Sequence, residues 1–463
     1  MTTTPNGQAD VIGGNSLRID RLPGSATIAR RWEPTISQAS AVSFRALLAF
    51  TFVLLVAPQL LFPALRPLRL AMICAVIAIG SYILGRASRG GPLSVRSPEL
   101  GAGAALAVWA IVTVPFSFWP GGSIAFLQDQ YLKVLAIFWL IPNVVDTPAR
   151  LRRVMSALTL LSLPASMIGL TSYLSGAFLA NSLIDRIAGY DSPLTNNPND
   201  LALLLALMLP VTLALVPHAR GSFRRVFLWA TAGVQTIAIV VTFSRTGFVA
   251  LGALGTLHAL RLARRRRFDL IFLALVLVAC AIPVLPTGYV ARIATIGNID
   301  SDVTGSSEAR WNDMVTAAQL IATHPLVGAG VDQGVLALND ARGDTWRTVH
   351  NAYLEVGIDL GLPGIGVFAF LVARAIRTTG WALAWMGRRP GAAPAELHTL
   401  AGGIRLSLIV FAVGALFSPV AYHFYLYYFA GLAVAVRQII YRADAAAHLA
   451  LSPSTITPRR SAT

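Results

Sequence analysis

The sequence predicts an all-α polytopic membrane protein with about 12 transmembrane helices and one large extracytoplasmic loop between helices 9 and 10. Of its 463 residues, 55% are hydrophobic and only 13% are charged, whereas about a quarter of the residues in soluble domains are charged. The mean hydropathy is +0.65. A membrane-spanning helix needs about 20 apolar residues, and such stretches recur along most of the chain.

The apolar stretches follow one another through short connections, apart from one long polar interruption. We place spans near residues 44–64, 68–85, 99–119, 130–146, 154–176, 201–217, 225–243, 246–263, 269–288, 353–375, 402–420 and 422–440. The chain then divides into a disordered cytoplasmic tail (1–41), helices 1–9 (42–288), a loop domain (289–352), helices 10–12 (353–442) and a second cytoplasmic tail (443–463). The first tail lacks the continuous apolar core of a secretory signal.

The net charge is +16, and the positions of the basic residues along the chain predict the orientation of the helices. Its basic residues cluster in short connections, where the positive-inside bias predicts the cytoplasm. With both termini inside, nearly every arginine cluster is cytoplasmic, and Arg66 and Arg69 are the main exceptions. Because the charge is explained in this way, we expect no nucleic-acid partner. The loop domain then lies outside the cytoplasm.

The loop domain is polar and net acidic. Its helical spacing of Trp311, Met314, Val315, Ala318 and Ile321 predicts an amphipathic helix on the membrane surface or against the bundle. Two glycine-containing bends, residues 324–330 and 339–344, are expected after it. Its seven acidic residues are Asp300, Asp302, Glu308, Asp313, Asp332, Asp340 and Asp344.

Two arginines on the predicted outer side could hold an anionic group. Arg245 lies in Ser244-Arg245-Thr246-Gly247, between the seventh and eighth spans, where the positive-inside bias disfavours it. It could equally be an interfacial arginine in a tight turn. Arg310 lies on the amphipathic helix, and its alternative is a solvated side chain paired with Asp313.

Five further polar residues gather at the same predicted end of the spans. A neutral imidazole at His350 could accept a proton from a hydroxyl nucleophile, although a single histidine is more often structural. Asn199 and Asn351 precede or begin spans, where asparagine also caps helices. Glu355 and Asp359 share one helix face inside the tenth span, where ionisable groups usually face a polar cavity.

Several catalytic motifs are missing from the sequence. It contains no P-loop, no G-x-S-x-G elbow, no H-E-x-x-H and no GxGxxG. Both cysteines lie in apolar runs, and no second histidine close to His350 supports a metal site. We therefore expect no cofactor and a substrate that arrives already activated.

This pattern resembles the O-antigen ligase and O-antigen polymerase superfamily of bacterial envelope proteins. The resemblance rests on three short segments in a fixed order, together with the span plan. These segments are Phe243-Ser244-Arg245-Thr246-Gly247, the helix 306–322 running into His324-Pro325-Leu326-Val327-Gly328-Ala329-Gly330, and His350-Asn351-Ala352-Tyr353-Leu354 followed by Gly361-Leu362-Pro363-Gly364.

The resemblance implies a metal-independent glycosyltransferase in the bacterial inner membrane. Such enzymes move a glycan from undecaprenyl diphosphate to a glycan or lipid acceptor on the outer face, in lipopolysaccharide or exopolysaccharide biosynthesis. Arg245 and Arg310 would hold the diphosphate, and His350 would act as base or steady the leaving diphosphate. Asn199, Asn351, Glu355 and Asp359 would contact sugars or serve helix packing. Ligase and polymerase are not separated by these motifs.

The main alternative is a transporter of a solute or lipid-linked sugar. A transporter is expected to carry polar groups near the bilayer midplane, with internal repeats or broken helices. The sequence instead gathers its candidate groups at one end of the spans. A scaffolding membrane protein stays open as well, because each candidate residue also has a structural explanation.

Overall fold

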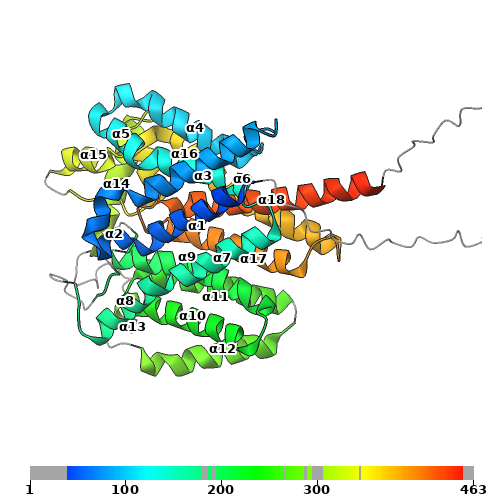
Figure 1. Cartoon of the computed structure of the whole chain (residues 1–463). Helices are drawn as coiled ribbons and strands as arrows, with labels where there is room; N and C mark the ends of the chain where they lie inside the picture. The colour runs from blue at the N-terminus through cyan, green and yellow to red at the C-terminus, as the bar shows by residue number, and fades with distance from the viewer. Residues whose placement is uncertain are drawn as a thin grey trace, which may run out of the picture.

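The computed structural model describes residues 39–179, 186–189, 194–195, 197–264, 266–285, 289–294, 306–343 and 346–451. Throughout these ranges the regular structure is helical, with no strand (Figure 1). The helices are α1 (Ala41–Val56), α2 (Pro58–Leu61), α3 (Leu70–Ala87), α4 (Pro98–Thr113), α5 (Pro120–Phe126), α6 (Leu132–Val144), α7 (Pro148–Leu161), α8 (Leu163–Leu174), α9 (Pro198–Leu215), α10 (Ser222–Val241), α11 (Arg245–Arg264), α12 (Phe268–Ala281), α13 (Tyr289–Ala294), α14 (Ser306–Thr323), α15 (Gly334–Arg342), α16 (Ala352–Arg388), α17 (Ala395–Gly414) and α18 (Phe424–Leu451).

The fold class is that of an all-α polytopic membrane protein. Ten helical stretches of the described chain are long and apolar enough to cross a membrane. All twelve predicted spans overlap a helix, but α1 and α12 are shorter, with 16 and 14 residues. The fold class is therefore confirmed, and the number twelve stays a prediction.

Four helices form the centre of the bundle. α9, and α18 as far as Ile440, are apolar on almost every side, and their residues are nearly all buried. α16 and α17 pack against them, while α10, α11 and α12 lie along one flank (Figure 1). A helix that is apolar all round belongs in the interior of a large bundle. This centre fixes the positions of the helix ends that carry the candidate residues.

α16 is interrupted near its beginning. Gly361 has φ 67° and ψ −168°, a left-handed conformation that only glycine adopts without strain. Pro363 follows and has no N–H to donate. The interruption frees three carbonyls, which accept hydrogen bonds from elsewhere: Ile358 O from Ala329 N (2.6 Å), Asp359 O from Gly330 N (3.0 Å) and Leu360 O from Trp109 Nε1 (2.9 Å).

The turn 324–330 fits directly onto this interruption. A Cβ on Gly361 would lie 2.4 Å from Leu326 O, and one on Gly328 would lie 2.4 Å from Ile358 O. The N–H of Leu362 also donates to Pro325 O at 2.8 Å. The glycines of both motifs are therefore needed because two backbones touch, and this contact anchors the loop domain to the bundle.

We expect Gly361→Ala to destabilise the protein by at least about 1–3 kcal/mol, the usual cost of a strained backbone conformation. The Cβ would also collide with Leu326 O. The measurement is the midpoint of thermal unfolding in detergent. Gly366→Ala is the matched control, because Gly366 lies in the same helix with nothing within 4 Å of its Cβ position. Equal midpoints for the two variants would contradict the packing described here.

The predicted amphipathic helix corresponds to α14, and its residues divide between the bundle and the outside of the molecule. Trp311 and Val315 are exposed, whereas Asp313, Ala317 and Ile321 are buried. The reason is an ion pair between Asp313 and Arg342 of α15, which allows a carboxylate on the inner face. Around it, Ala317 and Ile321 pack with residues of α15 and α16 in a small separate core.

Other boundaries also differ from the prediction. The expected bend at 339–344 is helical as far as Arg342, because α15 continues through it. The expected tail from 443 begins as helix, since α18 extends to Leu451. Of the two predicted tails, residues 1–38 and 452–463 lie outside the described residues, as do Asp300, Asp302 and Asp344.

Candidate functional site

A polar cavity of about 410 Å³ lies where the ends of α9 and α16 meet the loop domain. Asn199 and Asp200 line it from α9, Glu355 from α16, and His350 from the segment before α16. The remaining lining residues come from the N-cap of α9, from the loop domain, from α5 and the turn after it, and from the connection between α17 and α18: Asn197, Asp332, Thr348, Phe126, Gln130, Pro419, Tyr422 and His423.

Asn199 is held at the cavity wall by two neighbours. Its Oδ1 accepts hydrogen bonds from Ser244 Oγ at 2.8 Å and from Arg186 Nη2 at 3.0 Å. Asn197 caps α9 by accepting from Asn199 N at 2.8 Å. The N-cap thus fixes the backbone of Asn199, whose side chain is bonded to Ser244, the residue before Arg245. Arg186 was not among the sequence candidates.

Arg245 is the first residue of α11 and is 9% exposed. The tight turn before it places Phe243 at φ 52°. A Cβ on Gly247 would lie 2.9 Å from both Ala202 Cβ and Ile239 Cγ2, so glycine permits α11 to approach α9 and α10 closely. Arg245 does not line the cavity, but it adjoins Ser244, which is hydrogen-bonded to the cavity wall at Asn199.

His350 is half-buried and its ring nitrogens are distinguishable. Nδ1 lies 3.1 Å from Thr348 O. Because a carbonyl only accepts, Nδ1 carries the hydrogen and the neutral ring has its lone pair on Nε2. Burial, followed by the positive charge of Arg310, lowers the pKa of His350 to about 4. The imidazole is therefore neutral at physiological pH.

Arg310 lies on α14 within electrostatic reach of His350, as the effect on the histidine pKa indicates. The structural explanation offered for it was an ion pair with Asp313. Asp313 also forms an ion pair with Arg342 of α15. Arg310 does not line the cavity itself.

Asn351 has a structural function. Its side chain accepts hydrogen bonds from Tyr353 N at 2.9 Å and Leu354 N at 3.2 Å, which makes it the N-cap of α16. Glu355, one turn later, accepts from Ala421 N at 3.0 Å through Oε2. The cap and this bond together fix the start of α16 beside the cavity.

Asp359 connects α16 to the loop domain. It is 2% exposed, and its Oδ2 accepts from Asp332 N at 2.9 Å. Asp332 has φ 62° and lines the cavity. Burial raises the pKa of Asp332 to about 6. Asp359 therefore positions a loop carboxylate, and both residues share a small pocket with Glu355.

A groove of about 520 Å³ continues from the cavity, with which it shares Phe126, Gln130 and Asp332. Trp119 and Trp346 line it and are 61% and 65% exposed. The five residues after α5, Leu127–Tyr131, form a π-helical turn that brings Asp129 and Gln130 to this groove. Such turns often occur at functional sites.

Aromatic rings support the cavity from the side of the bundle. Tyr422 contacts Phe126 and Tyr131 edge-on, with ring centroids 5.3 and 5.0 Å apart. Tyr131 is fully buried, and its hydroxyl lies 3.0 Å from the hydroxyl of Tyr427. Such packed rings resist rearrangement, so this wall of the cavity is rigid.

The structure brings most of the sequence candidates to one place. Asn199, His350 and Glu355 line the cavity, and Asp359 lies behind it. Sequence reasoning missed the groove and the roles of Asp200, Asp332, Tyr422 and His423 as lining residues. The predicted outer position of the loop domain was the one available signal for Asp332. In the part of the chain that the structure describes, no three His, Cys, Asp or Glu side chains gather to hold a metal ion.

Comparison with known proteins supports the motifs. Residues 226–369 match the family model described as O-antigen ligase. The matched segment runs from α10 to the first half of α16 and so includes Arg245, Arg310 and His350. No match was found among the curated proteins.

Proposed function

We propose a specific transfer reaction for this chain, on the ground that residues 226–369 match the family model described as O-antigen ligase. The protein moves a glycan from undecaprenyl diphosphate to a glycan or lipid acceptor on the outer face of the bacterial inner membrane. The observation that carries the proposal is the cavity that joins His350 to Asn199, beside Ser244 and Arg245. One site can thus bring an anionic leaving group and a base together.

In this proposal the diphosphate lies at the Asn199 wall of the cavity, and the arginines stand behind the residues that line it. Arg245 and Arg310 compensate its charge, and Arg186, bonded to Asn199, joins them. Guanidinium groups suit this role because they donate two parallel hydrogen bonds to phosphate oxygens. Their charge is fixed before the reaction, so it stabilises the oxygen that becomes negative as the bond breaks.

The acceptor hydroxyl is activated by His350 in this scheme. The hydroxyl oxygen attacks the anomeric carbon of the donor glycan and forms the new glycosidic bond. The bond between that carbon and the diphosphate oxygen breaks, and its electron pair leaves with undecaprenyl diphosphate. The hydroxyl proton passes to Nε2 of His350, whose lone pair is available because Nδ1 is bonded to Thr348 O.

The groove beside the cavity suits the acceptor glycan. Trp119 and Trp346 offer exposed rings on which sugars can stack, and Gln130, Asp129 and Asp332 can accept or donate hydrogen bonds to hydroxyls. The carboxylates disfavour anionic sugars at this position. Acceptors with neutral or amino sugars are therefore preferred in the proposal.

The transporter alternative is tested in vesicles that contain the purified protein. A labelled oligosaccharide on undecaprenyl diphosphate is added with a glycan acceptor, and both transfer and passage into the lumen are followed. We expect label on the acceptor with no uptake of free oligosaccharide. Uptake without transfer would establish the transporter and exclude the glycosyltransferase.

The low pKa of His350 predicts an unusual pH dependence. Protonation removes the base, so the His350-dependent rate falls only as the pH approaches about 4. Between pH 5 and 8 its contribution is expected to change by less than about twofold. Because the pKa of Asp332 is raised to about 6, the profile is also measured with Asp332→Asn. An acid limb centred near 6.5 in that variant would contradict the burial of His350.

A further inference from the structure

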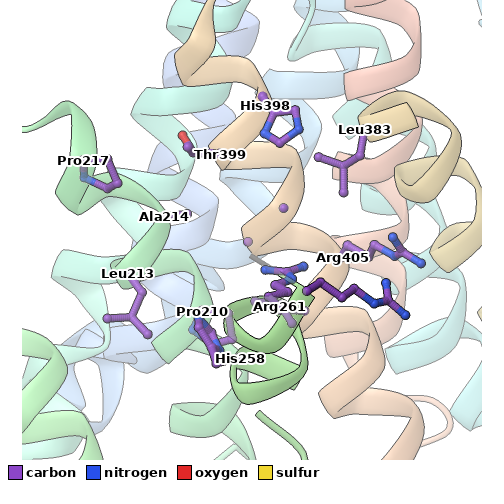
Figure 2. A pocket seen from close by; sticks show the side chains of 14 residues that line it. Pro210, Leu213, Ala214, Pro217, His258, Arg261, Leu383, His398, Thr399 and Arg405 are labelled. Atoms are coloured by element: carbon purple, nitrogen blue, oxygen red, sulfur yellow. The ribbon is translucent and has the colours of Figure 1, made fainter. Parts of the chain in front are cut away.

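A second pocket, shown from close by in Figure 2, is lined by residues of α9, α11, α16 and α17. It has a volume of about 420 Å³ and lies between α9, α11, α16 and α17. Arg245 begins α11, whereas Arg261 of the pocket lies in its last turn, roughly 24 Å further along at 1.5 Å per residue. The pocket is therefore separate from the cavity around His350, at the end predicted to be cytoplasmic.

The lining of this pocket is strongly basic. It contains Arg261, Arg264 and Arg405, together with two histidines, and none of its described lining residues is acidic. Glu396, on the first turn of α17, forms an ion pair with Arg152 at 3.0 Å and lies outside the lining. The pocket thus concentrates positive charge, and an anionic group is the ligand that this charge favours.

The position of Arg405 cannot be explained by the helix dipole, unlike the positions of the other two arginines in the pocket. Arg261 and Arg264 lie in the last turn of α11, where cations offset the helix dipole in any protein. Arg405 lies in the middle of α17, inside a candidate span, where an arginine is costly. Its Nε is buried without a hydrogen-bond partner, and its guanidinium reaches toward Gly380 of α16. A bound anion would supply the missing compensation.

The pocket also has an apolar part. Leu213 and Leu383 line it together with the arginines (Figure 2), and Leu406 is a further apolar lining residue. α11 borders it, and most residues of that helix are not buried in the bundle, so the pocket adjoins a surface that faces the membrane. A phosphate with acyl chains fits this combination better than a free phosphate does. Gly402 keeps the space open, because nothing lies within 4 Å of its Cβ position.

We propose that this pocket binds the phosphate of an anionic phospholipid, in the leaflet opposite the candidate site. The phosphate lies between Arg261 and Arg405, and its acyl chains lie along α11. Lipid bound there would join α9, α11, α16 and α17 at their far ends. Because a ligand of the folded state raises stability, the lipid is expected to raise the unfolding temperature.

The test compares phosphatidylglycerol, phosphatidylcholine and inorganic phosphate added to the purified full chain in neutral detergent. Native mass spectrometry measures the lipid retained, and thermal unfolding measures its effect. We expect retention and stabilisation with phosphatidylglycerol, and much less with the other two. The double variant Arg261→Gln/Arg405→Gln is expected to retain about tenfold less phosphatidylglycerol.

A second variant and a control keep the result interpretable. Gly402→Leu leaves all three arginines in place but fills the pocket, so it should also lose lipid retention. Arg388→Gln removes an exposed arginine near the same end, outside the pocket, and should retain lipid normally. Unchanged retention in Gly402→Leu would overturn the proposal. Stabilisation by inorganic phosphate equal to that by phosphatidylglycerol would overturn the assignment to a lipid.

Discussion

Replacing His350 by alanine is expected to lower the rate of glycan transfer by roughly 10²–10⁴-fold, the usual contribution of a positioned general base. His350 lines the cavity, and its Nδ1 bond to Thr348 O leaves Nε2 for the acceptor hydroxyl. Substitution by alanine removes the proton acceptor but leaves Arg245 and Arg310 in place. The measurement is the initial rate of transfer at saturating donor, which reports the chemical step separately from donor affinity.

His324→Ala is the matched control for this variant. His324 belongs to the same loop domain, is exposed, and contacts Thr323 and Phe118, with no part in the cavity. Its loss should change the transfer rate by less than about twofold, as expected for a surface substitution. If His350→Ala folds and transfers as fast as the wild type, His350 is not the base. Asp200, Asp332, Glu355 and His423, the other lining groups able to accept a proton, would then be tested as Asn, Asn, Gln and Ala variants.

Replacing Arg245 by alanine is expected to reduce transfer by about 10²–10³-fold, comparable with the loss of one preorganised donor to a developing oxyanion. The effect should appear in the rate at saturating donor as well as in donor affinity, because charge on the diphosphate increases as the bond breaks. Arg245→Lys keeps the charge but loses the paired donors, so we expect it to recover only part of the activity.

Two measurements separate a chemical effect of Arg245 from a structural one. Arg245 is almost completely buried, so each variant is first compared with the wild type by thermal unfolding. Arg66→Ala is the matched control, since Arg66 is exposed and is predicted on the same side of the membrane. Full activity of a folded Arg245→Ala protein would remove Arg245 from the diphosphate site. A loss of activity equal to that of Arg66→Ala would do the same.

The helices were predictable because each span is one continuous apolar run. Hydrophobic length does not depend on what packs against it, so every predicted span overlaps a helix. The inner face of α14 was not predictable in the same way. Asp313 is buried because Arg342, on the next helix, neutralises it. An interpretation from hydrophobic periodicity places a carboxylate on the surface of the protein. Asp313 is an exception, because its ion pair compensates the charge in the interior.

The parts of the candidate site that lie within one short motif were predictable from the sequence. The parts that the fold brings together from distant segments were not. The motif His350-Asn351 identified one wall of the cavity from the sequence, and Ser244 to Gly247 identified a segment that is hydrogen-bonded to another wall at Asn199. Asp332 reaches it because the interrupted α16 holds the turn 324–330 against its freed carbonyls, whereas Tyr422 follows Ala421, whose N–H donates to Glu355. The two tryptophans of the groove are separated by more than two hundred residues, so no local pattern connects them. The sequence contains glycines at positions 328 and 361, but it does not reveal that the backbones of the two segments contact each other there.

The central claim is transfer of a glycan from undecaprenyl diphosphate by this protein alone. The direct measurement uses purified wild type in detergent, a synthetic undecaprenyl diphosphate oligosaccharide with labelled sugar, and glycan or lipid acceptors, with the two products quantified together. Our account predicts equal amounts of labelled acceptor and released undecaprenyl diphosphate, both abolished in His350→Ala. Absence of labelled acceptor from folded wild type with every acceptor tested, or equal transfer by His350→Ala, would contradict it.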